Sequence, residues 1–288
     1  MGQWDAWIGR TQVQQDRLTP SLLHRFLATI DGDVGSDSAP QGIHWCLCTP
    51  EATTAELGAD GHPARTDSAN SFFPPVPLPR RMWASSAVEF LAPLSVNAEI
   101  IRTSTIAAIK EKSGGSGLLV FVDVDHETLT DGVLAVRERQ TLVYREASSA
   151  PAKAGAQSPP PPTSGLLPPQ EHERWSFHRT LTPSETMLFR FSAITFNSHR
   201  IHYDAPYATA EEGYRGPVVH GPLMASLLLD LAAQQFGHNR LRSFAFRAQA
   251  PAFVNEPLHL VGRREGDAVT LAALGPDGQV RLAAEGKF

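Results

Sequence analysis

Three histidines and one aspartate cluster in a single segment of the chain, residues 192–222. His199, His202 and Asp204 are close neighbours, and His220 follows directly before an apolar stretch that begins at Gly221. An imidazole exchanges protons near neutral pH. The start of a helix offers free backbone N–H groups to a developing negative charge. Together these features indicate chemistry at a carbon next to a carbonyl group.

Three kinds of site are compatible with these histidines. Histidine and aspartate are common ligands of zinc and iron, but the spacing is not that of a helical zinc motif, in which Glu follows the first His. A structural role, with buried imidazoles bonded to carbonyl groups, would account for one or two of them. Acid–base catalysis accounts for the whole cluster beside a helix start. We therefore expect a catalytic site and no metal.

A segment rich in proline and serine, residues 148–170, divides the chain. Such a composition buries little and gives an extended, solvated linker. We expect an N-terminal domain of residues 1–147 and a C-terminal domain of residues 171–288. An Ala-Pro-x-x-Val-Asn sequence occurs in both, at residues 92–97 and 250–255, each time after an alternating stretch. This repetition indicates that the two domains arose by duplication.

Each domain has one strong helix signal. Thr19 and Pro20 open a helix over residues 18–31, and Gly237 ends an apolar helix over residues 221–236. Alternating strands follow at residues 98–110, 117–125 and 133–145 in the first domain and at residues 241–249, 258–264, 269–274 and 280–284 in the second. The pattern predicts an α+β protein with two antiparallel sheets, each wrapped around one central helix.

The first domain also contains a long irregular insertion, residues 32–82, rich in Gly, Pro, Ser and Asp. Such insertions often act as lids. Phe72 and Phe73 could cap an apolar tunnel or belong to a solvated loop. Cys46 and Cys48 alternate on an expected strand, residues 43–48, and are too close in sequence to form an unstrained disulfide.

The composition restricts partners and compartment. A net charge of −5 and a pI of about 6.1 give no overall attraction to nucleic acid. The N-terminal residues lack the pattern of a signal peptide, and no apolar run approaches bilayer-spanning length, so we expect no membrane partner. Two buried thiols are typical of a reducing compartment. These features predict a cytoplasmic protein.

Residues 191–208 resemble the hydratase motif of MaoC-like, hotdog-fold (R)-specific enoyl-CoA hydratases. The family pattern is approximately aromatic-Ser-Gly-Asp-x-Asn-Pro-x-His-x-Asp-Pro-x-x-Ala, and it is matched by His202, Asp204, Pro206 and Ala208. Residues 213–221 are similar to the segment that leads into the family's central helix. The resemblance implies a double hotdog that hydrates or dehydrates 2-enoyl-CoA thioesters.

The first domain carries the same resemblance to one branch of this family. It is similar to the degenerate N-terminal hotdog of mesaconyl-C4-CoA hydratases, itaconyl-CoA hydratases and hydroxyacyl-thioester dehydratases type 2 at residues 7–10, 18–20, 79–83, 112–117 and 143–146. The branch implies a short branched or dicarboxylic acyl-CoA such as mesaconyl-CoA or itaconyl-CoA. The substrate would carry the CoA, and no cofactor is expected.

One departure from the broad motif concerns the chemistry. Asn197 stands where the motif has its catalytic Asp, and His199 where it has Asn. An amide cannot shuttle a proton, so we expect His202 to be the principal acid–base group and Asn197 to position water or substrate. His199 would share the proton transfer or orient its neighbours. The backbone N–H of Gly221 would donate to the thioester oxygen, and Asp204 would hold a loop or an imidazole.

Arginines near the motif are the expected binders of CoA phosphates or of a substrate carboxylate. The candidates are Arg190, Arg200 and Arg215, with Arg200 favoured, and His220 is a further substrate-binding candidate. Each arginine could equally form an ordinary surface ion pair.

Two other functions fit parts of this pattern. A hotdog acyl-CoA thioesterase would use water to attack the carbonyl carbon, and a non-catalytic acyl-CoA-binding protein would keep the tunnel without the chemistry. Whatever the function, the sheet edges of a double hotdog can pair with a second copy, so a homodimer is the expected assembly.

Overall fold

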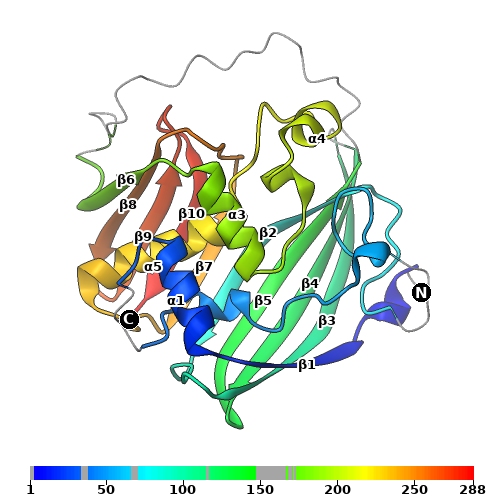
Figure 1. Cartoon of the computed structure of the whole chain (residues 1–288), viewed down its shortest axis with the longest axis horizontal. Coiled ribbons are helices and arrows are strands. Elements are labelled where there is room, and N and C mark those ends of the chain that lie inside the picture. The colour runs from blue at the N-terminus through cyan, green and yellow to red at the C-terminus, as the bar shows by residue number, and fades with distance from the viewer. Residues whose placement is uncertain are drawn as a thin grey trace.

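The computed structural model describes residues 3–33, 38–65, 71–114, 117–146, 167, 171 and 173–288. Its ten strands form one antiparallel sheet in the order β1-β3-β4-β5-β2-β7-β10-β9-β8-β6 (Figure 1). The strands are β1 (Thr11–Arg17), β2 (Arg80–Phe90), β3 (Glu99–Gly114), β4 (Gly117–Thr130), β5 (Val133–Arg145), β6 (Phe177–Leu181), β7 (Ser243–Ala248), β8 (Leu258–Glu265), β9 (Ala268–Leu274) and β10 (Val280–Lys287).

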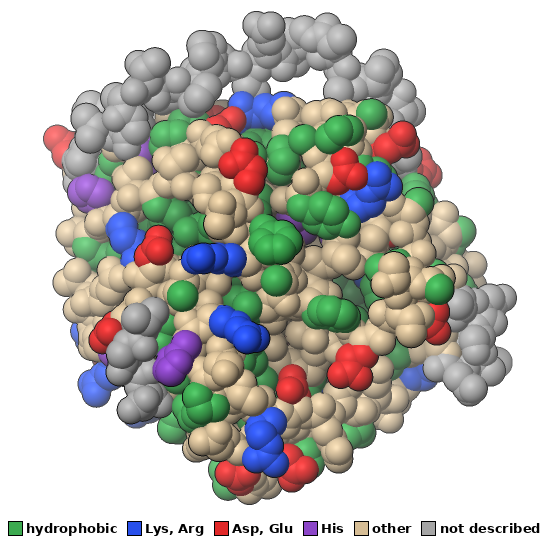
Figure 2. All heavy atoms as spheres, viewed as in Figure 1, with side chains coloured by type: hydrophobic (Ala, Val, Ile, Leu, Met, Phe, Trp, Pro, Cys, Tyr) green, Lys and Arg blue, Asp and Glu red, His purple; other side chains and the backbone are tan. Residues whose placement is uncertain are grey.

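The helices lie on one side of the curved sheet (Figure 1). The α-helices are α1 (Pro20–Thr29), α3 (Glu185–Ile194), α4 (Ala205–Ala210) and α5 (Gly221–Phe236), and short 3-10 helices are η1 (Asp5–Trp7), η2 (Ile43–Cys46), η3 (Thr54–Glu56) and η4 (Arg200–His202). None of the helices in the described residues is long and apolar enough to cross a membrane. On the visible part of the face in Figure 2, basic and acidic side chains are intermixed rather than gathered into one charged surface.

The strand order of the second half mirrors that of the first, and the two halves join where β2 pairs with β7. The repeated Ala-Pro-x-x-Val-Asn sequences occupy equivalent places. Asn97 and Asn255, their last residues, both have a left-handed backbone, with φ of 69° and 62°. The Asn97 amide donates to Leu18, and the Asn255 amide donates to Pro183. The local structure of the two halves is therefore repeated, as the sequence predicted.

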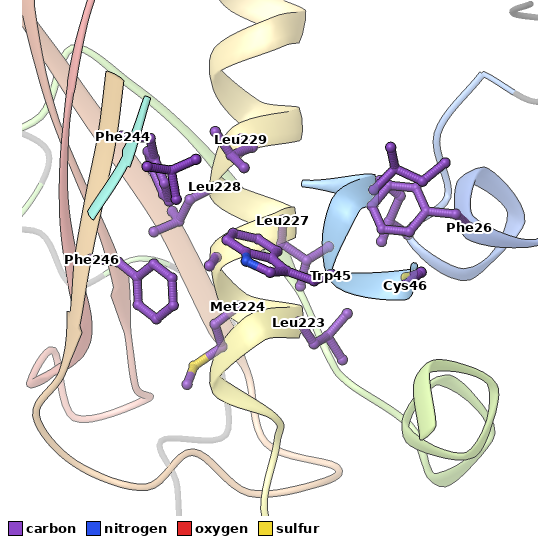
Figure 3. Close-up of a cluster of buried hydrophobic side chains, with 14 of the residues drawn as sticks. Phe26, Trp45, Cys46, Leu223, Met224, Leu227, Leu228, Leu229, Phe244 and Phe246 are labelled. Atoms are coloured by element: carbon purple, nitrogen blue, oxygen red, sulfur yellow. The ribbon is translucent and has the colours of Figure 1, made fainter. Parts of the chain in front are cut away.

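Helix α5 is the central helix of the second half. It begins and ends where the sequence predicted, and Gly237 ends it with a positive φ of 96°. Leu223, Leu227 and Leu228 are among its nearly fully buried residues. Figure 3 shows them with Met224 and Leu229 packing between the sheet residues Phe244 and Phe246 and the first-half residues Trp45 and Phe26. The core of the protein is thus shared by both halves.

The first half differs from the expected arrangement. Helix α1 confirms the predicted cap, because Thr19 Oγ1 accepts the Leu22 amide. However, α1 packs against α3 and η2, and α3 is capped in the same way by Ser184, directly after edge strand β6. Helix α1 is therefore the counterpart of α3 rather than of α5. The sequence pattern suggested a central helix at α1 because α1, like α5, buries apolar residues.

Residues 43–48 are not a strand, as we had expected from their alternation. They begin with η2 after Gly42, whose φ of 98° turns the chain, and Cys48 has a left-handed φ of 51°. All six residues are buried. The alternation in the sequence therefore does not correspond to a buried and a solvent-facing side of a strand. Cys46 and Cys48 are both free and buried, as predicted.

Several boundaries differ from the sequence-based expectation. Strand β2 begins at Arg80, so the end of the insertion at residues 32–82 is part of the sheet. Strands β1 and β6 were not anticipated, and neither was α3, which extends into the motif segment. Of the proposed linker at residues 148–170, only Leu167 is within the described residues, so the domain boundaries stay a prediction.

Candidate active site

A cavity of about 1440 Å³ connects the histidine cluster to the first half of the sheet. Its walls come from the segment between α3 and η4, from the start of α5, from the insertion and from strands β2 to β5. Phe72 and Phe73, for which a cap or a solvated loop was considered, are among its lining residues. Phe189, Phe196 and Tyr203 also line it, and all three are more than half exposed at 67%, 62% and 52%. The cavity therefore reaches the surface past aromatic side chains.

The turn after α3 places the motif residues in this cavity. Phe196 has a left-handed φ of 48°. The next residue, Asn197, accepts a hydrogen bond from the His199 backbone amide at its side-chain Oδ1, 3.1 Å away. The His202 amide then donates to the His199 carbonyl within η4. Asn197, His199 and His202 all line the cavity. The Asn197 side chain thus shapes the turn in addition to facing the cavity.

His202 has a defined tautomer. Its Nδ1 lies 2.7 Å from the carbonyl oxygen of Val218, and because a carbonyl only accepts, Nδ1 carries the proton. Burial lowers the pKa of His202 to about 4, so the ring is neutral at pH ~7. Its Nε2 therefore holds a free lone pair. This arrangement makes His202 a base whose orientation is fixed by the backbone.

His220 lies directly behind His202. The two rings stack with centroids 3.6 Å apart, and Ser192 Oγ lies 2.8 Å from His220 Nε2. His220 precedes Gly221 as the N-cap residue of α5. A Cβ added to Gly221 would meet nothing within 4 Å, so open space lies beside the first helical residue. His220 is thus a buried support of the His202 ring that also lines the cavity.

A second carboxylate–imidazole pair reaches the site from the insertion. His62 Nδ1 lies 3.0 Å from Asp60 Oδ2, and the His62 ring packs on His199 with centroids 4.1 Å apart. Burial raises the pKa of the Asp60 carboxyl, but the hydrogen bond and charge of His62 outweigh it and hold the pKa well below its usual range. Asp60 is therefore ionised, and His62 donates Nδ1–H to it and keeps Nε2 free.

The insertion is fixed to the motif segment by direct hydrogen bonds. The Arg200 amide donates to the Asp60 carbonyl at 2.9 Å, and Ser198 Oγ donates to the Gly61 carbonyl at 2.5 Å. Gly61 has a φ of 85°, and any Cβ there would collide with the Ser198 carbonyl. Sequence reasoning missed this pair. The Asp-Gly-His run was the available signal, but its partners are far away in the sequence.

Asp60, His62 and His199 are also the one group of described residues that could hold a metal ion, with ligand atoms within 4.8 Å of one another. The chemistry of these three side chains is poorly suited to a metal ion. The carboxylate is already bonded to His62, and the positive charge of Arg81 acts on both imidazoles. A nearby guanidinium disfavours a cation and favours an anion.

The three arginines expected to bind substrate have other partners. Arg200 forms a 2.7 Å ion pair with Asp204 and lies over the Tyr207 ring. Arg215 pairs with Glu256, and Arg190 is exposed and makes a long 3.5 Å contact to Ala28. None of them is among the described residues that line the cavity. Asp204 also accepts the Tyr207 amide as N-cap of α4, which is the loop-holding role expected for it.

Other arginines line the cavity instead: Arg65, Arg81, Arg102 and Arg145. Acidic lining residues among those described are Glu51 and Glu138. Glu138 is buried and bonded to Trp45, at 3.1 Å, and to Ser86, at 2.5 Å. Arginine therefore outnumbers acidic side chains along the described walls, and the cavity suits an anionic ligand.

The buried histidines should make the protein sensitive to acid. Burial lowers the pKa of His126 and His202 to about 4 and that of His199 to about 2, whereas an unfolded histidine titrates near ~6.5. Below that pH the unfolded state binds more protons, so stability is lost as pH falls toward the folded pKa values. We expect the free energy of unfolding, measured with urea, to drop by at least ~2 kcal/mol between about pH 7 and about pH 5.

A His126→Gln variant provides the control for this prediction. His126 is bonded to Ser104 at 2.7 Å in the first half of the cavity, and its removal should make the decrease smaller. A free energy of unfolding that stays constant over this pH range would contradict the burial of neutral histidines.

A family model for hydroxyacyl-thioester dehydratase type 2 matches residues 42–254. The mesaconyl-C(4)-CoA hydratase of Chloroflexus aurantiacus is 42% identical over 285 residues, which cover 98% of this chain and 96% of that protein.

Solved structures show the same fold at low sequence identity. HtdX of Mycobacterium tuberculosis has a TM-score of 0.67 at 15% identity and covers 96% of this chain and 98% of its own. A second protein of that organism, described as a double hotdog, has a TM-score of 0.55 at 10% identity and covers 97% of this chain and 96% of its own. The predicted double-hotdog class is confirmed.

Proposed function

Because this chain belongs to the hydroxyacyl-thioester dehydratase type 2 family, we propose that it reversibly adds water across the C2=C3 bond of a short, dicarboxylic 2-enoyl-CoA thioester such as mesaconyl-CoA or itaconyl-CoA. It is a hydro-lyase. The observation that carries the proposal is the free Nε2 of His202 beside the start of α5, inside a large cavity. The name of the Chloroflexus relative and the arginines of the walls support a dicarboxylic substrate.

In the proposed mechanism His202 performs both proton transfers. Its Nε2 takes a proton from water while the water oxygen bonds to C3. The electron pair of C2=C3 moves toward the thioester, and the Gly221 backbone N–H donates to the thioester oxygen that becomes negative. C2 then takes the proton from the His202 imidazolium, which restores the thioester. The net change is one water added, and dehydration is the reverse.

The neighbouring residues support this transfer. Asn197 and His199 hold the attacking water by hydrogen bonds, and His220 keeps the His202 ring in place by stacking. Asp60 and His62 supply a carboxylate and an oriented imidazole against His199, in a site where Asn197 replaces the acidic residue of the family motif. The negative charge of Asp60 favours a positive charge on the adjacent imidazoles, as it forms during proton transfer.

The remaining parts of the proposal concern cofactor, assembly and compartment. Imidazoles and backbone N–H groups suffice for this chemistry, so the reaction uses no cofactor. Strands β1 and β6 each pair on one side only among the described residues, which supports a homodimer formed at a sheet edge; light scattering would give the mass. The buried free thiols support a cytoplasmic location, which localisation of the tagged protein would check.

A spectrophotometric assay tests the proposed function. Purified protein is mixed with mesaconyl-C4-CoA, itaconyl-CoA and crotonyl-CoA in buffer containing EDTA, and loss of the enoyl-thioester absorbance is followed while free thiol is measured in parallel. We expect hydration of a dicarboxylic thioester without thiol release. Thiol release without loss of the enoyl group would show a thioesterase, and loss of activity caused by EDTA would contradict a metal-free site.

A further inference from the structure

A dicarboxylic enoyl thioester carries its second charge close to the reacting atoms. In mesaconyl-C4-CoA the free carboxylate is attached to C3, the carbon that water attacks. A side chain that binds this carboxylate must therefore lie beside the proton-transfer residues and must be a cation with unused donors. Carboxylates are bound most specifically by the planar fork of arginine. The following inference rests on the proposed function.

Three of the four cavity arginines interact with other groups of the protein. Arg65 donates to the carbonyls of Val76, Leu78 and Pro79. Arg102 donates to the His44 carbonyl on the side of the cavity near His126. The buried Nε of Arg145 has no hydrogen-bond partner among the described residues, but its charge acts on the Glu212 carboxylate, which also forms an ion pair with Arg80. Arg65 and Arg102 are thus bound to carbonyl groups, and Arg145 has a carboxylate of the protein nearby.

Arg81 is different. It lies on β2 in register with Tyr144 of β5, is half-buried and lines the cavity. Its guanidinium lies 5.8 Å from the centre of the Phe73 ring. The Arg81 guanidinium forms no hydrogen bond or ion pair with any other described residue. A half-buried guanidinium that has donors to spare is suited to an anionic group of a ligand.

Arg81 also lies on the correct side of the cavity. Burial is the main cause that lowers the pKa of His62 and of His199, and the positive charge of Arg81 lowers both further. Its guanidinium is therefore within electrostatic reach of the histidine cluster, at the part of the cavity where C3 would react. Arg65 also lowers the pKa of His62, but among the cavity arginines only Arg81 is a main influence on both histidines.

We propose that Arg81 binds the acyl carboxylate of the substrate and thereby selects dicarboxylic over monocarboxylic enoyl thioesters. The ion pair fixes C3 next to the histidines, and Phe73 shields it from water on one side. A monocarboxylic substrate of equal size leaves the Arg81 charge without a partner in a partly desolvated cavity, which weakens its binding. Arg81 is thus a specificity-determining residue rather than a proton-transfer residue.

The test uses two substrates that differ only in this carboxylate. Mesaconyl-C4-CoA has a methyl group and a carboxylate on C3, and 3-methylcrotonyl-CoA has two methyl groups there. For Arg81→Gln we expect kcat/KM for mesaconyl-C4-CoA to fall about 10- to 100-fold, the range of one charged hydrogen-bonded contact. The already low value for 3-methylcrotonyl-CoA should be unchanged or rise. Arg81→Lys should recover only part of the loss, since an ammonium group cannot bind in a fork.

The same comparison excludes the other source of negative charge. If Arg81 bound the CoA phosphates, both substrates would lose the same factor, and this result would overturn the proposal. An unchanged preference in Arg81→Gln would overturn it as well. Arg137→Gln is the matched control, because Arg137 lies exposed on the same sheet and pairs with Glu127.

A binding measurement keeps this result separate from the proposed function. Succinyl-CoA and butyryl-CoA are saturated thioesters with a carboxylate or a methyl group at the corresponding position. We expect the wild-type protein to bind succinyl-CoA at least ~10-fold more tightly, and Arg81→Gln to lose this preference. If the wild type has this preference but hydrates no enoyl thioester, the proposed function fails and the assignment of Arg81 stands. Equal affinities in the wild type would overturn the assignment.

Discussion

Replacement of His202 by alanine is expected to lower kcat/KM for hydration by about 10³-fold or more while the affinity for acyl-CoA stays within about threefold of the wild type. His202 Nε2 is the free lone pair that the backbone carbonyl of Val218 orients, and alanine leaves nothing at that point to accept the water proton. The measurement pairs initial hydration rates with calorimetric titration of succinyl-CoA, a ligand that the enzyme cannot hydrate.

Two controls separate lost chemistry from lost structure. His24→Ala removes an exposed histidine from α1 and should leave both rate and affinity unchanged. His202→Gln keeps a side chain of similar length that can still donate to the Val218 carbonyl but offers no imidazole, and it should be as inactive as His202→Ala. A glutamine variant with near wild-type turnover would exclude His202 as the proton-transfer residue.

Replacement of Asp60 by asparagine is expected to lower kcat about 10- to 100-fold, the range of one hydrogen bond to a charged group. Asparagine keeps the shape of the side chain, but it removes the negative charge that favours protonation of His62 and His199. The acidic limb of the pH–rate profile should therefore move to lower pH, because protonation of these rings becomes less favourable. A purely structural role for Asp60 would leave the position of that limb unchanged.

Asp125→Asn is the matched control for this variant. Asp125 is also bonded to a basic side chain, Arg139, at 2.7 Å, but its partner is a surface arginine rather than an imidazole of the histidine cluster. Its replacement should alter neither kcat nor the pH–rate profile. Equal effects of Asp60→Asn and Asp125→Asn would mean that the Asp60–His62 pair takes no part in the reaction.

The elements with strong local signals could be predicted from the sequence. Helix α5 is mostly apolar and is followed by Gly237, so both of its ends were predictable. The long strands of both halves alternate clearly and are separated by short turns. Strands β1 and β6 escaped detection because they are polar edge strands, with largely exposed or half-exposed side chains. Their place in the sheet depends on pairing with distant strands.

The candidate site was predictable only where its residues are neighbours in sequence. His199, His202 and His220 were found because they lie close together beside the start of α5. The Asp60–His62 pair was missed because the insertion that carries it has no periodicity, and its place is fixed by bonds to Ser198 and Arg200. The sequence shows that Asn197 stands in place of the motif's carboxylate, but only the tertiary structure shows that Asp60 lies close to His62 and His199.

The arginines illustrate the same limit. Arg200 and Arg215 were candidates because they lie near the motif in sequence, with Arg200 favoured, but their guanidinium groups bind Asp204 and Glu256. Arg81 is more than a hundred residues from the motif, and β2 brings it to the cavity because it pairs with both β5 and β7 at the junction of the two halves. The histidines predicted from proximity in sequence therefore line the cavity, whereas the predicted arginines are not among its described lining residues.

The central claim is that water attacks C3 of an enoyl thioester and leaves the thioester bond intact. Mass spectrometry after reaction in ¹⁸O-labelled water tests it most directly, with mesaconyl-C4-CoA as substrate. The account predicts a hydroxyacyl-CoA product with one labelled oxygen at C3 and the CoA still attached. A free acid with the label in its carboxylate, together with released CoA, would contradict it.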